Sequence, residues 1–143
     1  MTVKAILSRK GNDVVTVEPN APLAVAIKVL AERRIGALVI TGADHRVVGI
    51  LSERDIVRTV AERGPGALNQ AVADVMTRKV VTCSQSETVC EIMERMTSGK
   101  FRHVPVVEQG RLIGLVSIGD IVKSRVEEME RESAALHDYI RTA

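Results

Sequence analysis

Two short motifs place a serine three residues ahead of an aspartate. Ser52 precedes Asp55 and Ser117 precedes Asp120, each pair following a glycine and a run of aliphatic residues. At this spacing the serine oxygen can accept a hydrogen bond from a helix N-terminal amide, and the carboxylate suits the positive end of the helix. The same carboxylate, held at the end of a strand, can also accept hydrogen bonds from the two hydroxyls of a ribose. The residues alone leave helix capping and ribose recognition both open.

Basic side chains gather around both motifs, where a helix N-terminus also offers free amides to phosphate oxygens. They are Arg33, Arg34 and Arg54 in the first half of the chain, and Lys100, Arg102 and His103 in the second. These charges either neutralise a bound phosphate or form ordinary solvated surface. His103 precedes an apolar run, so it either closes the edge of the core or donates a hydrogen bond to a phosphate.

The elements that carry the motifs occur twice along the chain. Residues 47–57 return as residues 112–122, residues 14–16 as residues 80–82, and residues 3–10 as residues 72–79. A self-similarity of this length predicts an architecture built from two copies of one unit. We therefore expect two homologous halves.

Hydrophobic spacing predicts the order β-α-β-β-α in each half. In the first half we expect strands at Val14–Val17, Ala37–Thr41 and Val47–Leu51, and helices at Leu23–Arg33 and from Ser52 to Arg63. In the second half we expect strands at Val80–Cys83, His103–Val107 and Arg111–Val116, and helices at Glu87–Thr97 and from Ser117. The fold class is α/β in the α+β sense, with two units packed sheet to sheet about a pseudo-twofold axis.

The domain organisation follows from the length of 143 residues. Two units of this size are each marginal alone, so we expect them to share a core as one module. The boundaries are residues 1–66 for the first unit, 67–125 for the second and 126–143 for a C-terminal amphipathic helix. That helix carries an apolar stripe that requires a partner surface, formed by Val122, Val126, Met129, Leu136, Tyr139 and Ile140. Its own domain, a twofold mate or another protein can supply that surface.

Composition argues against several classes of protein. The formal charge is +2 with both signs interspersed, which is not the basic field of a nucleic-acid binder. No apolar run is typical of a signal peptide or a membrane span, so we expect no membrane association and a cytoplasmic location. Cys83 and Cys90 lack the neighbouring ligands of a zinc site, and we expect no bound metal. Both thiols fall in apolar stretches and are expected to be buried and structural, so we expect no enzyme and no catalytic residue.

Several segments together resemble a known family. They are Asp74–Thr77, Phe101–Val107 and the two motifs of glycine, two hydrophobic residues, serine, two further residues and aspartate. This combination is similar to a tandem pair of cystathionine-β-synthase (CBS) domains, also called a Bateman module. The resemblance covers nearly the whole chain.

The resemblance implies that adenosine-containing ligands bind in clefts between the repeats, with AMP, ADP, ATP, NAD(H) or S-adenosylmethionine as candidates. It places the ribose on Asp55 and Asp120, with Ser52 and Ser117 beside the ribose or phosphate. Further positions carried over from the family flank the base or sugar: Thr16, Thr82, Ile35, Ala37, Ile50, Phe101, His103 and Leu115. The nearby Arg54, Lys100 and Arg102 favour ligands that carry phosphate.

The resemblance also implies the class of function. We expect a stand-alone sensor of adenine nucleotides that forms a homodimer and passes a conformational signal to a separate regulated protein. The alternative is a structural or adaptor protein whose nucleotide sites have lapsed. In that case Asp55 and Asp120 persist as helix caps.

Overall fold

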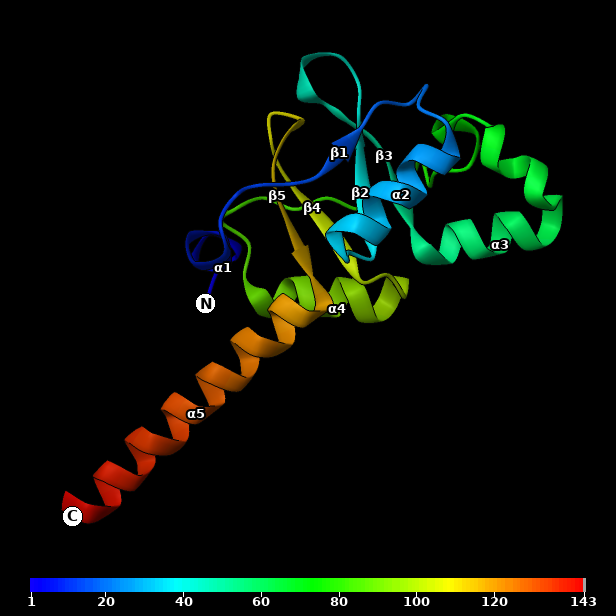
Figure 1. Ribbon diagram of the computed structural model, residues 1–143. Coiled ribbons are helices and arrows are strands. Elements are labelled where there is room, and N and C mark those ends of the chain that lie inside the picture. Colours follow the sequence, from blue (N-terminus) through cyan, green and yellow to red (C-terminus); the bar gives the residue numbers. More distant parts are fainter. Residues whose placement is uncertain (143) are drawn as a thin grey trace.

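Strands from the two halves of the chain form two separate small sheets (Figure 1). The computed structural model describes residues 1–142. In the first half, β1 (Thr16–Val17) lies parallel to β2 (Ala37–Thr41), which is antiparallel to β3 (Val47–Ser52). Helix α2 (Leu23–Arg33) joins β1 to β2, and α3 (Glu53–Arg63) follows β3. The two helices, β2 and β3 match the expected bounds to within one residue, whereas the first strand, expected at Val14–Val17, is confined to Thr16–Val17.

The second half repeats this plan with one strand fewer. Helix α4 (Val89–Gly99) precedes an antiparallel pair of strands, β4 (His103–Glu108) and β5 (Arg111–Ser117). Helix α5 (Ile118–Thr142) follows β5 directly and runs for 25 residues. Short 3₁₀ turns at Pro65–Asn69 and Val72–Asp74 connect the halves, and a third lies at Ala43–His45 in the β2–β3 hairpin. The predicted mixed fold with a long C-terminal helix is thus observed.

One predicted strand, Val80–Cys83, is wrong. Only Cys83 pairs, through a single parallel bridge to Val106 in which its amide donates to the Pro105 carbonyl and its carbonyl accepts from Val107. The next bond of a parallel ladder would need an amide hydrogen on Pro105, which proline does not have. Pro105, which interrupts the pairing, is present in the sequence, so the loss of this strand could have been predicted.

A helix that the sequence analysis did not predict, α1 (Val3–Lys10), opens the chain. Val3, Ile6 and Leu7 of α1 lie in the hydrophobic core of the second half, together with residues of α4, β4, β5 and α5. The matching residues 72–76 lie instead in the core of the first half, with residues of α2, β2 and β3. We call residues 3–10 and 72–79 the lead-in segments. Each core is therefore completed by the lead-in segment that precedes the other half.

The glycine of each repeated motif gives the lead-in segment room to pack. A Cβ at Gly114 would lie 2.7 Å from a methyl carbon of Leu7, and a Cβ at Gly49 would collide with the Met76 side chain. Beside Gly49, the amides and carbonyls of Ile50 and Thr77 exchange hydrogen bonds of 3.0 and 2.9 Å. The absence of a side chain at both glycines therefore lets the backbones approach closely.

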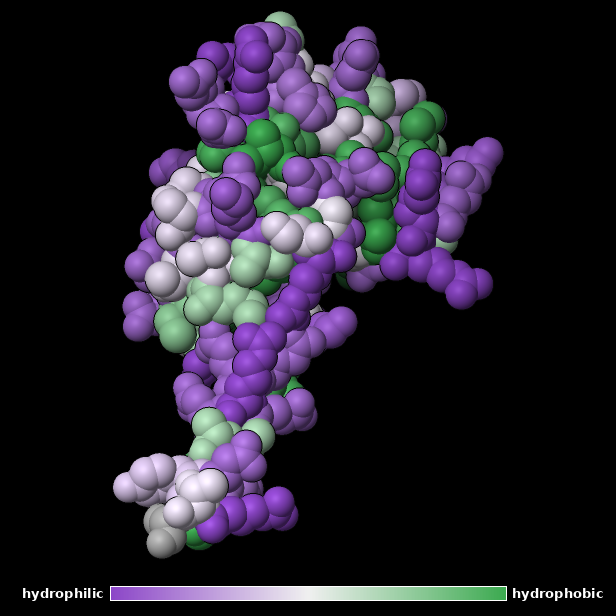
Figure 2. Space-filling model, turned by 90° about the vertical axis from the view of Figure 1, so that its left-hand side faces the viewer, coloured by the Kyte–Doolittle hydropathy of each residue, from purple (hydrophilic) through white to green (hydrophobic). Residues whose placement is uncertain are grey.

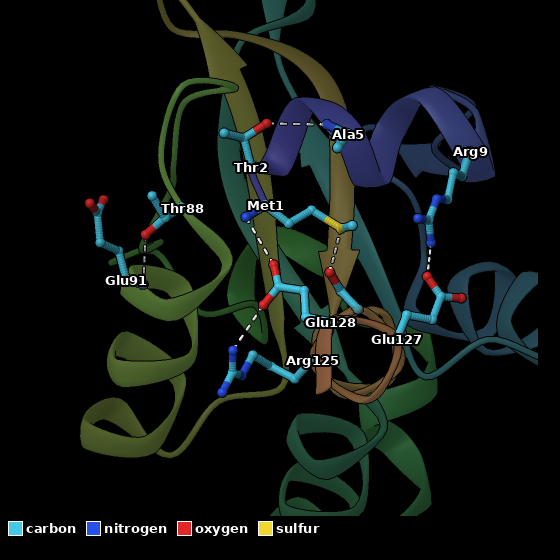
Figure 3. A network of polar contacts seen from close by, with 10 residues as sticks. Met1, Thr2, Ala5, Arg9, Thr88, Glu91, Arg125, Glu127 and Glu128 are labelled. Carbon is cyan, nitrogen blue, oxygen red and sulfur yellow. Dashed lines mark hydrogen bonds and ion pairs between the residues drawn. The ribbon is translucent and has the colours of Figure 1, made fainter. Parts of the chain in front are cut away.

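Helix α5 contacts the rest of the chain only through its first turns, within the described residues. Ile121 and Ser124 are buried, and everything from Met129 to Thr142 is exposed. Figure 3 shows the polar contacts that hold these turns: Arg9 of α1 pairs with Glu127, and Glu128 receives the Met1 amine at 2.9 Å and Arg125 at 2.8 Å. Beyond them α5 runs away from both sheets to the C-terminus (Figure 1).

Candidate functional site

A cavity of about 700 Å³ lies between the two halves, a size that suits a small-molecule ligand. The first half contributes the ends of β2 and β3 and the start of α3, and the second half contributes the loop before β4 and the start of α5. The lead-in segment 72–79 and the residues after it form a third wall. The lining is Gly36, Ala37, Ile50, Ser52, Glu53, Arg54, Asp55, Arg58, Thr77, Lys79, Val80, Val81, Gly99, Lys100, Phe101, Arg102, His103, Ser117, Ile118 and Gly119.

Asp55 is the most buried charged group of this lining. Its Oδ2 accepts hydrogen bonds from the Ser52 amide at 3.0 Å and the Ser52 hydroxyl at 3.1 Å, and the Asp55 amide donates to Ser52 Oγ at 3.2 Å. This reciprocal arrangement is a capping box at the N-terminus of α3. The capping function expected from the sequence is therefore present.

The other carboxylate oxygen of Asp55 has partners that a ligand can replace. Oδ1 accepts from Arg58 Nη2 at 2.8 Å and from Thr77 Oγ1 at 3.3 Å. The Arg58 side chain is 58% exposed, whereas that of Asp55 is 9% exposed. Because the Arg58 side chain is mostly exposed, its guanidinium can turn into water, and hydroxyl groups of a sugar can replace it at Oδ1 so that the buried carboxylate keeps its hydrogen bonds. One carboxylate can thus cap the helix and hold a ligand.

Asp120 forms the same cap in the second half but differs in its remaining partners. Its Oδ2 accepts from the Ser117 amide at 2.8 Å and the Ser117 hydroxyl at 3.0 Å. Lys10 of α1 donates to the same oxygen at 2.7 Å and to the Leu115 carbonyl at 2.9 Å. Burial opposes ionisation of Asp120, but the hydrogen bonds from Lys10 and Ser117 outweigh it and lower the pKa of the carboxyl. The carboxylate is therefore held by a cation of its own chain.

The structure distributes the predicted site residues between two places. The 700 Å³ cavity is lined by ten of them: Ala37, Ile50, Ser52, Arg54, Asp55, Lys100, Phe101, Arg102, His103 and Ser117. Asp120 lines a separate hollow of about 110 Å³ together with Ile6, Arg9, Lys10, Lys123 and Ser124. The other four residues line neither cavity. Thr16 pairs with Val39 in the sheet of the first half, and Ile35 packs against the hydrophobic core of that half. In the second half, the carbonyls of Thr82 and Leu115 accept hydrogen bonds from Arg95 and Lys10, respectively.

The sequence analysis did not single out several of the lining residues. Arg58 lies one helical turn after Asp55, so helical spacing could have identified it. Thr77 and Lys79 correspond to Ser8 and Lys10 in the repeat, but nothing in the sequence showed which half each lead-in segment joins. Their position depends on contacts between distant parts of the chain.

The charge of the cavity favours an anionic ligand. Five cationic side chains line it, Arg54, Arg58, Lys79, Lys100 and Arg102, against the two carboxylates of Glu53 and Asp55. Arg54 donates to the Lys100 carbonyl at 3.4 Å, which links the two walls. Attraction between such a group of cations and a phosphate is stronger in a cavity than in open water.

His103 joins this wall through its ring. A Cβ added to Gly36 would lie 3.5 Å from His103 Cε1, so the ring of the second half packs against the backbone of the first. Burial, followed by the charge of Lys10, lowers the pKa of His103 against the opposing effects of Asp120 and Glu53. The imidazole is consequently neutral at pH 7 and able to donate one hydrogen bond.

The two cysteines differ in exposure. Cys83 is buried as expected, but Cys90 is exposed on α4, so that prediction was wrong for Cys90. Burial, with a contribution from Glu87, raises the pKa of Cys83 to about 12, which keeps its thiol protonated and unreactive. Within residues 1–142, no cluster of three or more metal-binding side chains occurs and no helix is long and apolar enough to cross a membrane.

Comparison with known proteins shows matches along most of the chain. The family model for the CBS domain matches twice, at residues 3–62 and 72–127. A mitochondrial CBS domain-containing protein of Arabidopsis thaliana is 35% identical over 81% of this chain, which spans 58% of the plant protein. A crystal structure of a CBS-domain containing protein from Agrobacterium tumefaciens has a TM-score of 0.83 and 51% identity, covering 87% of this chain and 92% of that one.

Two further solved structures contain ligands. A CBS domain protein from Pyrobaculum aerophilum, complexed with AMP, has a TM-score of 0.75 and 30% identity, covering 84% of this chain and 89% of that one. The CBS domain pair of protein MJ0100, in complex with 5′-methylthioadenosine and S-adenosyl-L-methionine, has a TM-score of 0.80 and 27% identity, covering 90% and 98%. From its two matched repeats and their shared fold, the chain belongs to the CBS domain family, as a tandem CBS pair.

Proposed function

We propose that the chain is a regulatory module that binds an adenine nucleotide in the 700 Å³ cavity between its two halves. The proposal rests on one observation: a buried carboxylate at a helix N-terminus shares this cavity with five cationic side chains. A ribose and a phosphate need those two features together. The solved CBS pairs with AMP or S-adenosylmethionine support the same ligand class.

In this proposal Asp55 holds the ribose. Its hydroxyls replace Arg58 and Thr77 at Oδ1, while Oδ2 remains engaged in the helix cap. Arg58, once displaced, is free to meet the phosphate together with Arg54, Lys100 and Arg102. The adenine then lies against the apolar part of the lining, which consists of Ala37, Ile50, Val80, Val81, Phe101 and Ile118.

The charge of the site separates the candidate ligands. AMP, ADP, ATP and NAD(H) carry phosphate and suit the excess of cations. S-adenosylmethionine carries a sulfonium cation, which the same residues repel. We therefore propose a phosphate-bearing nucleotide as the ligand.

We propose that the second serine–aspartate motif, formed by Ser117 and Asp120, binds no ligand. Lys10 already neutralises Asp120 through the cap oxygen Oδ2, and it lines the hollow beside that carboxylate. A ribose there would meet a carboxylate whose charge is already neutralised, in a hollow of about 110 Å³ that is far smaller than the 700 Å³ cavity. We expect one nucleotide per chain.

Ligand binding would bias the arrangement of the two halves, because the cavity walls come from both. A ligand that contacts both walls favours the conformers in which they are close, which is a population shift that a regulated protein can detect. The alternative is an adaptor protein with lapsed sites, and the two complete helix caps support it, since both aspartates have a structural function without ligand.

Calorimetric titration of the nucleotide-free protein tests the proposal. The ligands are AMP, ADP, ATP, NAD, NADH and S-adenosylmethionine, with native mass spectrometry to count what remains bound. We expect a phosphate-bearing nucleotide to bind with a stoichiometry of one and to raise the unfolding temperature. No binding by any of them would favour the adaptor hypothesis.

A further inference from the structure

Helix α5 carries a regular apolar stripe that its own domain does not cover. Its members are spaced alternately four and three residues apart, and the five apolar ones are between 47% and 63% exposed: Val122, Val126, Met129, Leu136 and Ile140, with Ser133 completing the series. This spacing is the heptad pattern of a coiled coil, with Val126, Ser133 and Ile140 at a positions and Val122, Met129 and Leu136 at d positions.

The stripe and the face that docks on the domain are different sides of the helix. At about 100° per residue, the centre of the stripe formed by Val122, Val126 and Met129 lies more than a third of a turn from the centre of the face formed by Ile121 and Ser124. Glu128, which pairs with the Met1 amine, also projects toward that docked side (Figure 3). Figure 2 shows the far end of the helix standing clear of the body.

The exposed part of α5 needs a partner for physical reasons. Residues 129–142 are exposed throughout, and an unsupported helix of this length is marginal in water. A partner that presents the same heptad pattern is a second copy of the helix. We propose that α5 forms a parallel, in-register, two-stranded coiled coil with α5 of a second copy of this chain.

The types of apolar residue favour two parallel strands. The apolar a positions Val126 and Ile140 are β-branched, whereas two of the three d positions, Met129 and Leu136, are not; the first d position is Val122. This distribution is the one that favours parallel dimers over higher oligomers. Ser133 at the central a position adds a polar layer, which lowers stability but helps to fix the register.

The flanking charges distinguish the two orientations. In a parallel pair, Arg125 at a g position faces the partner's Glu130 at the following e position, and Glu132 faces the partner's His137. An antiparallel pair that aligns all the apolar layers instead places Glu130 against the partner's Glu130 and Glu132 against the partner's Glu132. Like charges opposed in this way are destabilising, so complementarity selects the parallel arrangement.

Sedimentation of the nucleotide-free protein tests the coiled coil independently of the ligand proposal. We expect wild type to sediment as a dimer of the 15.5 kDa chain. The Leu136→Glu/Ile140→Glu variant should be monomeric, or dimerise at least tenfold more weakly. The control Ala134→Glu/Ala135→Glu adds the same charge off the stripe and should remain dimeric. A monomeric wild type, or a dimer unaffected by Leu136→Glu/Ile140→Glu, would overturn the proposal.

A crosslinking experiment tests the orientation. In a Cys90→Ser background, which removes the exposed thiol, Ser133→Cys should form a disulfide-linked dimer under mild oxidation because residue 133 meets its own copy. Ala135→Cys, on the outside of the helix, should not. Glu130→Lys should weaken the dimer by facing the partner's Arg125, whereas Asp138→Lys makes the same charge change away from the interface and should have no effect. Absence of the Ser133 crosslink in a dimeric protein would exclude the parallel register.

Discussion

The ammonium of Lys10 lies 2.7 Å from Oδ2 of Asp120, so a residue of the first lead-in segment neutralises the aspartate of the second repeated motif. Its counterpart in the repeat, Lys79, lines the cavity beside Asp55. The two serine–aspartate motifs are repeated in the sequence, but the surroundings of their aspartates differ in the structure. They differ in the cation that pairs with the carboxylate, which is Lys10 for Asp120 and Arg58 for Asp55.

Replacing Lys10 should allow a nucleotide to bind at Asp120. Lys10→Met removes the ammonium that neutralises Asp120 but keeps an unbranched side chain, so the carboxylate regains its full charge as an acceptor for ribose hydroxyls. We expect the nucleotide stoichiometry measured by titration to rise from one to two per chain. Lys4→Met, on the exposed side of the same helix, is the control and should leave the stoichiometry at one. An unchanged stoichiometry in Lys10→Met would contradict the hypothesis that Lys10 prevents nucleotide binding at Asp120.

Asp55 should contribute to affinity and Asp120 should not. Asp55→Asn loses hydrogen bonds to a charged acceptor, which are worth about 1.5–3 kcal/mol each, so nucleotide affinity should fall by a factor on the order of ten or more. Asp120→Asn is the matched control, because it weakens an equivalent helix cap by about 1 kcal/mol without touching the cavity. Titration and urea unfolding of both variants separate the two effects. Equal affinity losses would refute the assignment of the ribose to Asp55.

The ion pair of Lys10 and Asp120 predicts a loss of stability in acid. The folded-state pKa of Asp120 is lowered below its usual 3.8, so the unfolded chain binds this proton more readily than the folded one. The contribution is complete above the usual pKa and disappears as the pH falls through the lowered value. Urea unfolding between pH 7 and pH 2.5 should show a difference between wild type and Asp120→Asn that shrinks below about pH 4. A constant difference would show that the charge is not the cause.

The repeated glycines should be intolerant of alanine. In Gly114→Ala the new methyl meets the end of Leu7 at 2.7 Å inside a packed core, which should cost about 1–3 kcal/mol of unfolding free energy. Gly66→Ala, where nothing lies within 4 Å, should change stability by less than about 0.5 kcal/mol. Denaturant unfolding of the two variants measures both. Similar values would show that the contact relaxes without strain.

The sequence predicts most elements because their signals are local. The bounds Leu23–Arg33 and Ala37–Thr41 are observed as expected, since helical and strand periodicity are properties of consecutive residues. Helix α1 and the missing strand at Val80–Cys83 depend instead on which core a segment joins and on one proline in a neighbouring strand. The same limit applies to the site: the Ser-Asp corners follow from a motif, whereas Thr77 and Lys10 reach those corners through contacts between segments far apart in the chain.

The exchange of lead-in segments has a consequence for folding on the ribosome. Val3, Ile6 and Leu7 are synthesised first, yet their core also contains Val116 and Ile121, near the other end of the chain. The first half, in contrast, has its lead-in residues 72–76 available as soon as it emerges. It can therefore close its core while synthesis continues, whereas α1 stays undocked until β5 and α5 have been made. Residues 3–10 therefore leave the ribosome before both halves of the module but dock only after both have been made.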